Sequence, residues 1–172
     1  SGADDVITDG EAIYLPPFHY AECGVARRLL ALRNGNGSLF PEDEPELPRG
    51  EGIVYDETQL EAVRLALKSK VMVLTGGPGT GKTTTTKAII GALRSSGMKV
   101  LLAAPTGRAS KRMSEATGME AKTIHRMLEY NPKDGYQRNA DNPLTGDALI
   151  VDECSMIDIL LMNNLLKAVP DG

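Results

Sequence analysis

The stretch from Val71 to Ser95 reads VMVLTGGPGTGKTTTTKAIIGALRS, and it is the most informative segment of the chain. Five residues typical of a β-strand, Val71 to Thr75, lead into GGPGTGKT at positions 76–83, and a helical pattern follows at once. This is the pattern G-x-x-x-x-G-K-[S/T] in a strand–loop–helix setting, which is typical of a loop that binds nucleotide phosphates. The glycines allow successive backbone N–H groups to turn toward phosphate oxygens, and the N-terminus of the following helix favours an anion.

The same loop supplies the residues that we expect to contact a nucleotide. Lys82 is expected to reach the β- and γ-phosphates and to act in catalysis, and the Thr83 hydroxyl is expected to bind Mg²⁺. The other predicted nucleotide-binding residues of this loop and its first helical turn are Gly77, Pro78, Gly79, Thr80, Gly81 and Thr84. A glycine-rich turn without a ligand is the alternative, and the flanking strand and helix patterns argue against it.

A later apolar run, Ala148 to Val151, ends in two carboxylates, Asp152 and Glu153. We expect Asp152 to bind Mg²⁺ together with Thr83, and Glu153 to orient and polarise the water that attacks the γ-phosphate. A cap at the end of the strand is the alternative for this pair. Ser155 has two interpretations of equal weight, a contact near the γ-phosphate or a cap of the last helix.

Composition limits the class of protein. A chain of 172 residues has room for one α/β domain with a small addition. The net charge of −4 conceals a basic region, because residues 82–138 contain 11 Lys and Arg but 4 Asp and Glu. That excess favours a surface that faces a polyanion, with a mixed solvated surface as the alternative. Cys23 and Cys154 lack metal-site spacing and are expected to be reduced and buried. No run of transmembrane length and no signal-peptide pattern is found, so a cytoplasmic protein without membrane contact is expected.

Local patterns predict the remaining elements. Residues 6–15 favour a hairpin closed by a type I′ turn at Asp9-Gly10, and residues 18–33 favour a helix with an apolar stripe. The predicted organisation has three parts: an N-terminal hairpin and helix segment at residues 1–37, an acidic Pro-rich linker at 38–51, and a partial ATPase domain at 52–172.

Within the third part, a helix is predicted at residues 56–69, in which Gln59 either completes a capping box with Asp56 or reads an adenine edge. The run at 99–104 predicts a buried strand that forms a βαβ unit with Val71 to Thr75. Residues 130–147 are turn-rich and predict a mobile surface loop, and a closing helix is predicted at 157–169. The fold class is therefore α/β, a P-loop NTPase with a mostly parallel sheet and flanking helices.

Four segments together resemble one helicase family. GGPGTGKT (76–83), APTGRASKRM (104–113), TIHRML (123–128) and VDECSM (151–156) are similar to successive motifs of RecD-type superfamily-one DNA helicases. These are the exodeoxyribonuclease V alpha-subunit family, especially its longer free-standing members. The segment YLPPFHYAECGVARRLLAL (14–32) resembles the region before the motor more weakly, and Cys154 stands where members often have alanine.

The resemblance implies a RecA-like ATPase domain that uses ATP and Mg²⁺ and moves 5′ to 3′ on single-stranded DNA. It also implies that Gln59 reads the adenine. The DNA-binding residues that it implies are Pro105, Thr106, Gly107, Arg108, Lys111, Thr123 and His125.

Members of this family continue into a further strand and a second RecA-like domain, which supplies an arginine for the transition state. We therefore expect this chain to be an incomplete first motor domain, whose partners are single-stranded DNA and the missing second RecA-like domain of the same polypeptide. Because translocation requires two domains that open and close, these residues alone are not expected to unwind DNA. The alternatives are another P-loop ATPase or a small-molecule kinase, and a nucleotide- or DNA-binding module without turnover.

Overall fold

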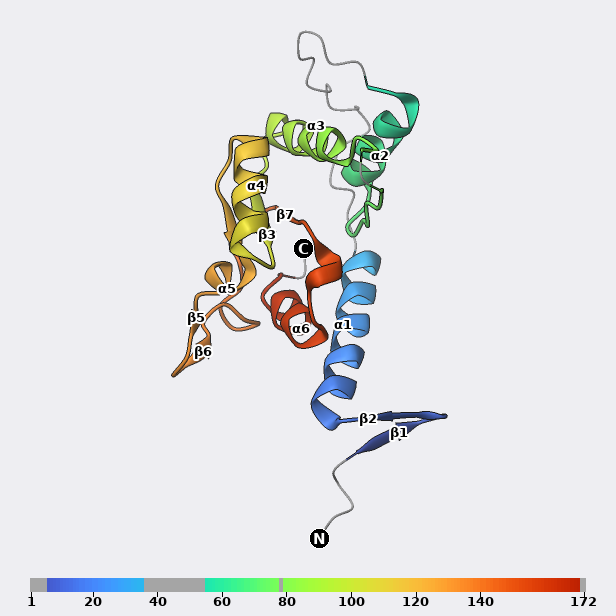
Figure 1. The fold of residues 1–172 in the computed structure, drawn as a ribbon, viewed down its shortest axis with the longest axis vertical. Coiled ribbons are helices and arrows are strands. Elements are labelled where there is room, and N and C mark those ends of the chain that lie inside the picture. Colours follow the sequence, from blue (N-terminus) through green and yellow to red (C-terminus); the bar gives the residue numbers. More distant parts are fainter. Residues whose placement is uncertain (1–5, 36–54, 78, 171–172) are drawn as a thin grey trace.

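The computed structural model describes residues 6–35, 55–77 and 79–170. A three-stranded parallel sheet lies at its centre in the order β4 (Ala121–Thr123), β3 (Val100–Ala104), β7 (Ala148–Val151) (Figure 1). Ala104 pairs with Thr123, and Ala103 pairs with Val151. The three strands therefore end side by side, at one edge of the sheet.

Three helices cover one side of this sheet. These are α2 (Glu57–Lys68), α3 (Lys82–Ser95) and α4 (Gly107–Thr117). Alternate residues of β3, Val100 and Leu102, face these helices, as the period of two in a strand requires. The buried residues of this cluster are Val63, Leu67, Ala88, Ile89, Ile90, Ala92, Leu93, Val100, Leu102 and Met113. The mixed α/β fold with a parallel sheet between helices, predicted from the sequence, is confirmed.

A second cluster packs around Ala103 of β3. It contains residues of α5 (Ile124–Met127) and α6 (Ile159–Lys167). The chain reaches α6 from β7 through a short 3-10 helix, η1 (Cys154–Met156). The buried members of this cluster are Ala103, Ile124, Met127, Leu128, Leu144, Leu161, Leu165 and Ala168.

The N-terminal segment consists of the hairpin β1 (Ile7–Asp9) and β2 (Ala12–Tyr14) and the long helix α1 (Pro16–Asn34). In the hairpin, Asp9 pairs with Ala12, so the turn is centred on Gly10-Glu11, and only Gly10 has a positive φ. The predicted type I′ turn at Asp9-Gly10 is therefore wrong, since that turn needs two central residues with positive φ.

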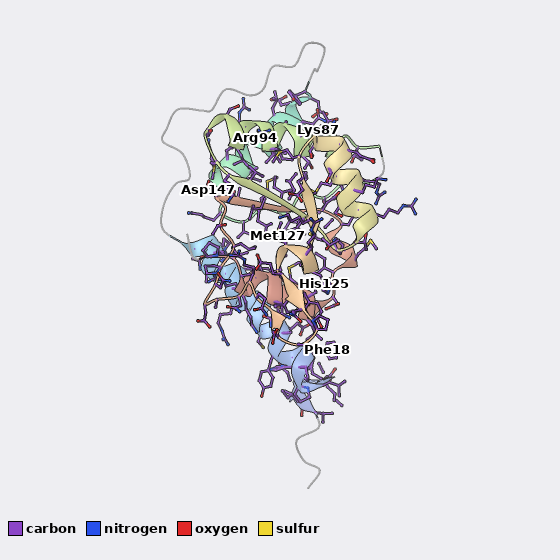
Figure 2. The ribbon with its side chains drawn as sticks, turned by 90° about the vertical axis from the view of Figure 1, so that its left-hand side faces the viewer. Phe18, Lys87, Arg94, His125, Met127 and Asp147 are labelled. Carbon is purple, nitrogen blue, oxygen red and sulfur yellow. The ribbon has the colours of Figure 1, made fainter. Side chains whose placement is uncertain are left out.

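Helix α1 packs along α6, and the two lie side by side in Figure 1. Arg28 of α1 donates hydrogen bonds to the carbonyl oxygens of Leu166 and Val169 at the end of α6. These hydrogen bonds join α1 to the C-terminal end of α6 and to the residues that follow it. Figure 2 shows the elongated molecule that results, with Phe18 of α1 near one end and Lys87 and Arg94 of α3 near the other.

The largest departure from prediction concerns Val71 to Thr75. These residues form no strand, and Val73 is 80% exposed. A strand sequence becomes a strand only when a neighbour completes its backbone hydrogen bonds. In the described part of the chain, the sheet holds only β4, β3 and β7. The βαβ unit predicted from Val71 to Ala104 is therefore absent, and the observed unit is β3–α4–β4.

Residues 130–147, predicted as a loop, include a second hairpin, β5 (Tyr130–Asn131) paired with β6 (Gly135–Tyr136). The Leu128 carbonyl accepts from the backbone N–H groups of Gln137 and Arg138, and Leu144 is buried. The predicted linker at 38–51 lies outside the described residues, so the division into three parts stays a prediction.

Candidate nucleotide and nucleic-acid site

The phosphate-loop segment curls tightly on itself. The Thr80 hydroxyl donates to the Gly77 carbonyl at 2.8 Å, and a Cβ on Gly76 would lie 2.5 Å from that hydroxyl oxygen. Gly79 and Gly81 have φ of 75° and 78°, a region that favours glycine. Gly81 is the N-cap of α3, so the free N–H groups of the first turn of α3 lie beside the loop. Pro78 is outside the described residues.

The first turn of α3 lies next to the end of β7. The Lys82 ammonium is 3.8 Å from Asp152 Oδ1, and the two side chains are 39% and 40% exposed. The backbone N–H of Glu153 also donates to Asp152 Oδ1, at 2.9 Å. Thr83 is exposed on the same turn of α3, and Thr84 is half-buried. The two predicted parts of the nucleotide site are therefore neighbours, although they are far apart in the sequence.

Glu153 has an unusual backbone and a specific partner. Its φ of 53° is in the left-handed region, which is uncommon for a residue other than glycine. Such conformations often occur at functional sites. Its Oε1 accepts a hydrogen bond from the Arg112 guanidinium at 3.2 Å, and Arg112 lies on α4. This pairing was not predicted from the sequence, because a contact across 41 positions has no local signal.

Gln59 lies between α2 and the loop. Its carbonyl accepts from the Asp56 backbone N–H at 3.1 Å, and the Asp56 carboxylate accepts from the Gln59 N–H at 2.8 Å. The capping box is therefore present. A Cβ on Gly81 would lie 2.6 Å from the Gln59 amide nitrogen, so the same side chain also borders the phosphate loop. Its role as the adenine reader stays a prediction.

Ser155 and the two cysteines depart from expectation. Asp158, not Ser155, caps α6 by accepting from the Leu161 N–H, so the capping interpretation of Ser155 is wrong. Cys23 and Cys154 are free but exposed, so the prediction of buried thiols is wrong in that respect. Partial desolvation of the sulfur raises the pKa of Cys154, the Asp152 charge raises it further, and Lys82 opposes them.

The predicted DNA-binding residues gather along the sheet edge and on α4. Thr106 and Thr123 are N-caps: their hydroxyls accept from the N–H groups of Ala109 and Arg126. Pairing of Ala104 with Thr123 brings the segments after β3 and β4 together. Arg108 and Lys111 are exposed on α4, as is Gly107, while Pro105 is half-buried.

His125 is exposed on α5 (Figure 2), and α5 lies next to the second hairpin (Figure 1). Its ring lies 5.6 Å from that of Tyr130 and 6.0 Å from that of Tyr136, measured between centroids. This aromatic group was not predicted from the sequence. The spacing of two tyrosines across an Asn-Pro and Asp-Gly turn signal could have indicated it.

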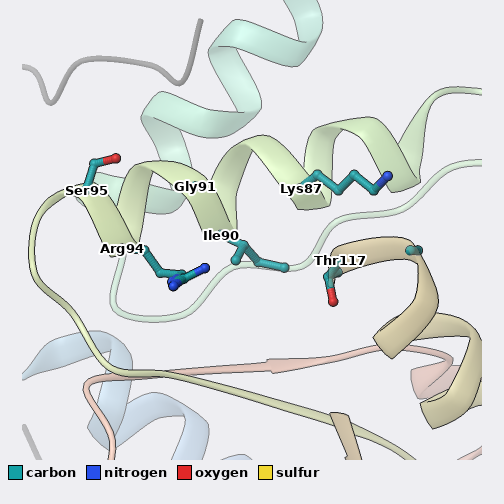
Figure 3. Close-up of a pocket in the computed structure, with 7 residues that line it drawn as sticks. Lys87, Ile90, Gly91, Arg94, Ser95 and Thr117 are labelled. Atoms are coloured by element: carbon teal, nitrogen blue, oxygen red, sulfur yellow. The ribbon is translucent and has the colours of Figure 1, made fainter. Parts of the chain in front are cut away.

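A cavity of about 550 Å³ lies beside the second half of α3. Figure 3 shows Lys87, Ile90 and Arg94 of α3 on one side of it and Thr117 of α4 on the other. It does not include the phosphate loop or the carboxylates. Among helices in the described ranges, none has the length and apolar character that a membrane span requires.

Comparison with known proteins identifies the class. Residues 59–172 match a family model described as the AAA domain, and this match covers more than half of the chain. The chain therefore belongs to this AAA domain family of P-loop proteins.

Individual relatives indicate more closely which type of protein within this family the chain resembles. The chain is 42% identical over 173 residues to the ATP-dependent RecD2 DNA helicase of Deinococcus radiodurans, covering 99% of this chain and 24% of that protein. It is 34% identical over 187 residues to the RecBCD enzyme subunit RecD of Mycobacterium tuberculosis, covering 95% and 32% of the two chains. It is 42% identical over 118 residues to the ATP-dependent DNA helicase dda of Enterobacteria phage T4, and this match covers 63% of this chain and 27% of that protein.

These matches confirm the resemblance to RecD-type helicases that the four motifs indicated. The chain spans about a quarter to a third of the length of these relatives.

Proposed function

We propose that this chain is the ATP-binding part of a DNA helicase motor, which couples ATP hydrolysis to 5′-to-3′ movement on single-stranded DNA in the cytoplasm. One observation carries the proposal. A lysine that follows a phosphate loop lies 3.8 Å from a carboxylate at the end of a parallel strand, and a second carboxylate follows directly. Relatives whose names describe ATP-dependent helicases support the same function.

The proposed substrate is ATP in complex with Mg²⁺. The residues present fit that substrate, because the Thr83 hydroxyl and the Asp152 carboxylate are the hard oxygen donors that Mg²⁺ prefers. Lys82 now pairs with Asp152. A γ-phosphate offers Lys82 a more highly charged partner, which leaves Asp152 available to the metal. In this role Lys82 binds the β- and γ-phosphates, and the backbone N–H groups from Gly79 to Thr83 surround them.

Glu153 is the proposed base. It directly follows the metal-binding carboxylate, and its carboxylate can accept a hydrogen bond from a water and polarise it for in-line attack on the γ-phosphorus. Gln59, which borders Gly81, is the proposed contact of the adenine edge. Turning Gln59 to the base would release one hydrogen bond of the capping box, the one from the Asp56 N–H.

Single-stranded DNA is the proposed second ligand. Its phosphates would contact Arg108 and Lys111 on α4 and the segment from Pro105 to Gly107. Thr123 and His125 would extend that contact beyond β4. A second RecA-like domain of the same polypeptide would complete the motor, and we propose that residues 1–172 alone do not unwind DNA.

The test is steady-state ATP hydrolysis by the full-length protein, with and without a single-stranded oligo-dT. The proposal predicts hydrolysis that increases when the DNA is added. Transfer of the γ-phosphate to a small alcohol or nucleoside would instead identify a kinase. Nucleotide binding without turnover in the presence of DNA would identify a binding module.

A further inference from the structure

Each of the two carboxylates after β7 forms an ion pair, and the two cationic partners lie on different elements. Asp152 pairs with Lys82, which belongs to the phosphate loop and α3. Glu153 pairs with Arg112, which belongs to α4. The first cation therefore lies on the proposed nucleotide surface, and the second lies on the helix that carries the proposed DNA contacts.

Arg112 is accessible to a further ligand. Its side chain is 62% exposed, whereas that of Glu153 is 33% exposed. Arg108 precedes it by four residues on α4 and therefore lies on the same side of the helix. A guanidinium binds phosphate with paired hydrogen bonds, so a DNA backbone that contacts Arg108 can compete for Arg112.

The contact occupies one of the two carboxylate oxygens of the proposed base. Glu153 Oε1 accepts a charge-assisted hydrogen bond from Arg112 at 3.2 Å. Such a bond holds the carboxylate in one orientation and occupies an acceptor position that a water could otherwise use. The pair thus opposes the role that the proposed function gives to Glu153.

We propose that Arg112 is a positioning residue that links DNA binding to hydrolysis. Without DNA, its guanidinium holds Glu153 and slows the attack of water. When a DNA phosphate binds to α4, it takes Arg112, and Glu153 is free to polarise the water. This inference rests on the proposed ATPase function and adds to it the group through which DNA accelerates the reaction.

The test uses the full-length protein and the variants Arg112→Ala and Arg112→Lys, with ATP hydrolysis measured with and without oligo-dT. Because an exposed ion pair is worth little free energy, we expect Arg112→Ala to raise the DNA-free kcat by about two- to fivefold. The KM for ATP should stay the same, and the ratio of DNA-stimulated to DNA-free kcat should fall by a similar factor. Arg112→Lys should retain part of the pairing and give an intermediate ratio.

Arg94→Ala is the matched control, since it removes an arginine from α3 at a distance from both carboxylates. It should leave the ratio at the wild-type value. The inference is overturned if Arg112→Ala leaves the ratio of DNA-stimulated to DNA-free kcat unchanged. It is also overturned if the variant lowers both kcat values by the same factor. In either case the proposed function stands. A wild-type protein whose ATP hydrolysis does not respond to oligo-dT overturns both.

Discussion

Lys82 Nζ lies 3.8 Å from Asp152 Oδ1, and this contact joins two segments separated by seventy positions of sequence. It exists because α3 begins beside the phosphate loop while β7 ends at the same edge of the sheet. Both side chains are close to 40% exposed, so the pair itself adds little to stability. Its significance is geometric: the contact brings a cation and two carboxylates to one place where a triphosphate and its metal could bind.

Replacing Lys82 with alanine should abolish ATP hydrolysis by the full-length protein and weaken nucleotide binding. The variant removes the cation that stabilises the β- and γ-phosphates. Turnover and the affinity for a fluorescent ATP analogue are the measurements. Lys87→Ala, a lysine-to-alanine change on the same helix, is the control and should behave as wild type. Wild-type turnover by the Lys82 variant would refute its role.

Glu153→Gln should separate binding from chemistry. The amide keeps the size of the side chain but cannot take a proton from water, so kcat should fall by about 10²- to 10⁴-fold. The affinity for Mg²⁺-ATP should change little, because Asp152 and Thr83 are intact. Single-turnover hydrolysis together with equilibrium binding measures both quantities. A kcat within tenfold of wild type would exclude Glu153 as the base.

Arg108→Ala should weaken binding to single-stranded DNA in a salt-dependent way. An arginine that contacts a phosphate releases about one counterion, so the slope of log affinity against log salt should decrease by about 1. Fluorescence anisotropy with labelled oligo-dT over a range of salt concentrations measures this slope. The account of α4 as a DNA-binding helix fails if both affinity and slope stay at wild-type values.

Leu165→Ala should destabilise this domain by about 2–5 kcal/mol, because large-to-small changes leave a cavity in a packed core. Leu165 is 1% exposed on α6, within the cluster beneath the sheet. Leu160→Ala on the same helix is the control. The Leu160 side chain is 37% exposed, so this variant should lower the free energy of unfolding far less. Scanning calorimetry of the full-length protein gives the shift of the domain's transition. Equal shifts for the two variants would contradict the assigned packing.

The thiol of Cys154 should react with iodoacetamide only at higher pH than a free thiol does. Desolvation and the Asp152 charge raise its pKa, so the thiolate is a smaller fraction at any given pH. Lys82 opposes this effect, so Lys82→Ala should move the titration to still higher pH. Site-resolved mass spectrometry over a pH series follows the alkylation. A midpoint below that of a free thiol would contradict the environment described for Cys154.

Local signals explain what could be predicted from sequence. Asp56 and Gln59 identify the start of α2, and the glycines of the loop identify the start of α3, because each signal acts within one helical turn. The carboxylates after β7 were predictable in the same way, as polar residues that end an apolar run. Their closeness to Lys82 was expected because the loops that bind ligands in parallel α/β folds gather at the carboxyl ends of the strands.

Other features depend on partners that a local pattern cannot identify. Val71 to Thr75 has strand composition, but a strand also needs backbone pairing, and in the described part of the sheet this segment pairs with neither edge strand, β4 or β7. The choice of Asp158 over Ser155 as the cap of α6 depends on where η1 ends. The pairing of Arg112 with Glu153 depends on the packing of α4 beside β7, which no spacing encodes.

The most direct test of the account is a crystal structure of the full-length protein with Mg²⁺ and a non-hydrolysable ATP analogue. The account predicts that the triphosphate lies against Lys82 and that the Thr83 hydroxyl is about 2.1 Å from the metal, with Asp152 bound to it directly or through a water. A nucleotide bound in the cavity beside Lys87 and Arg94, with Lys82 still paired to Asp152, would contradict it.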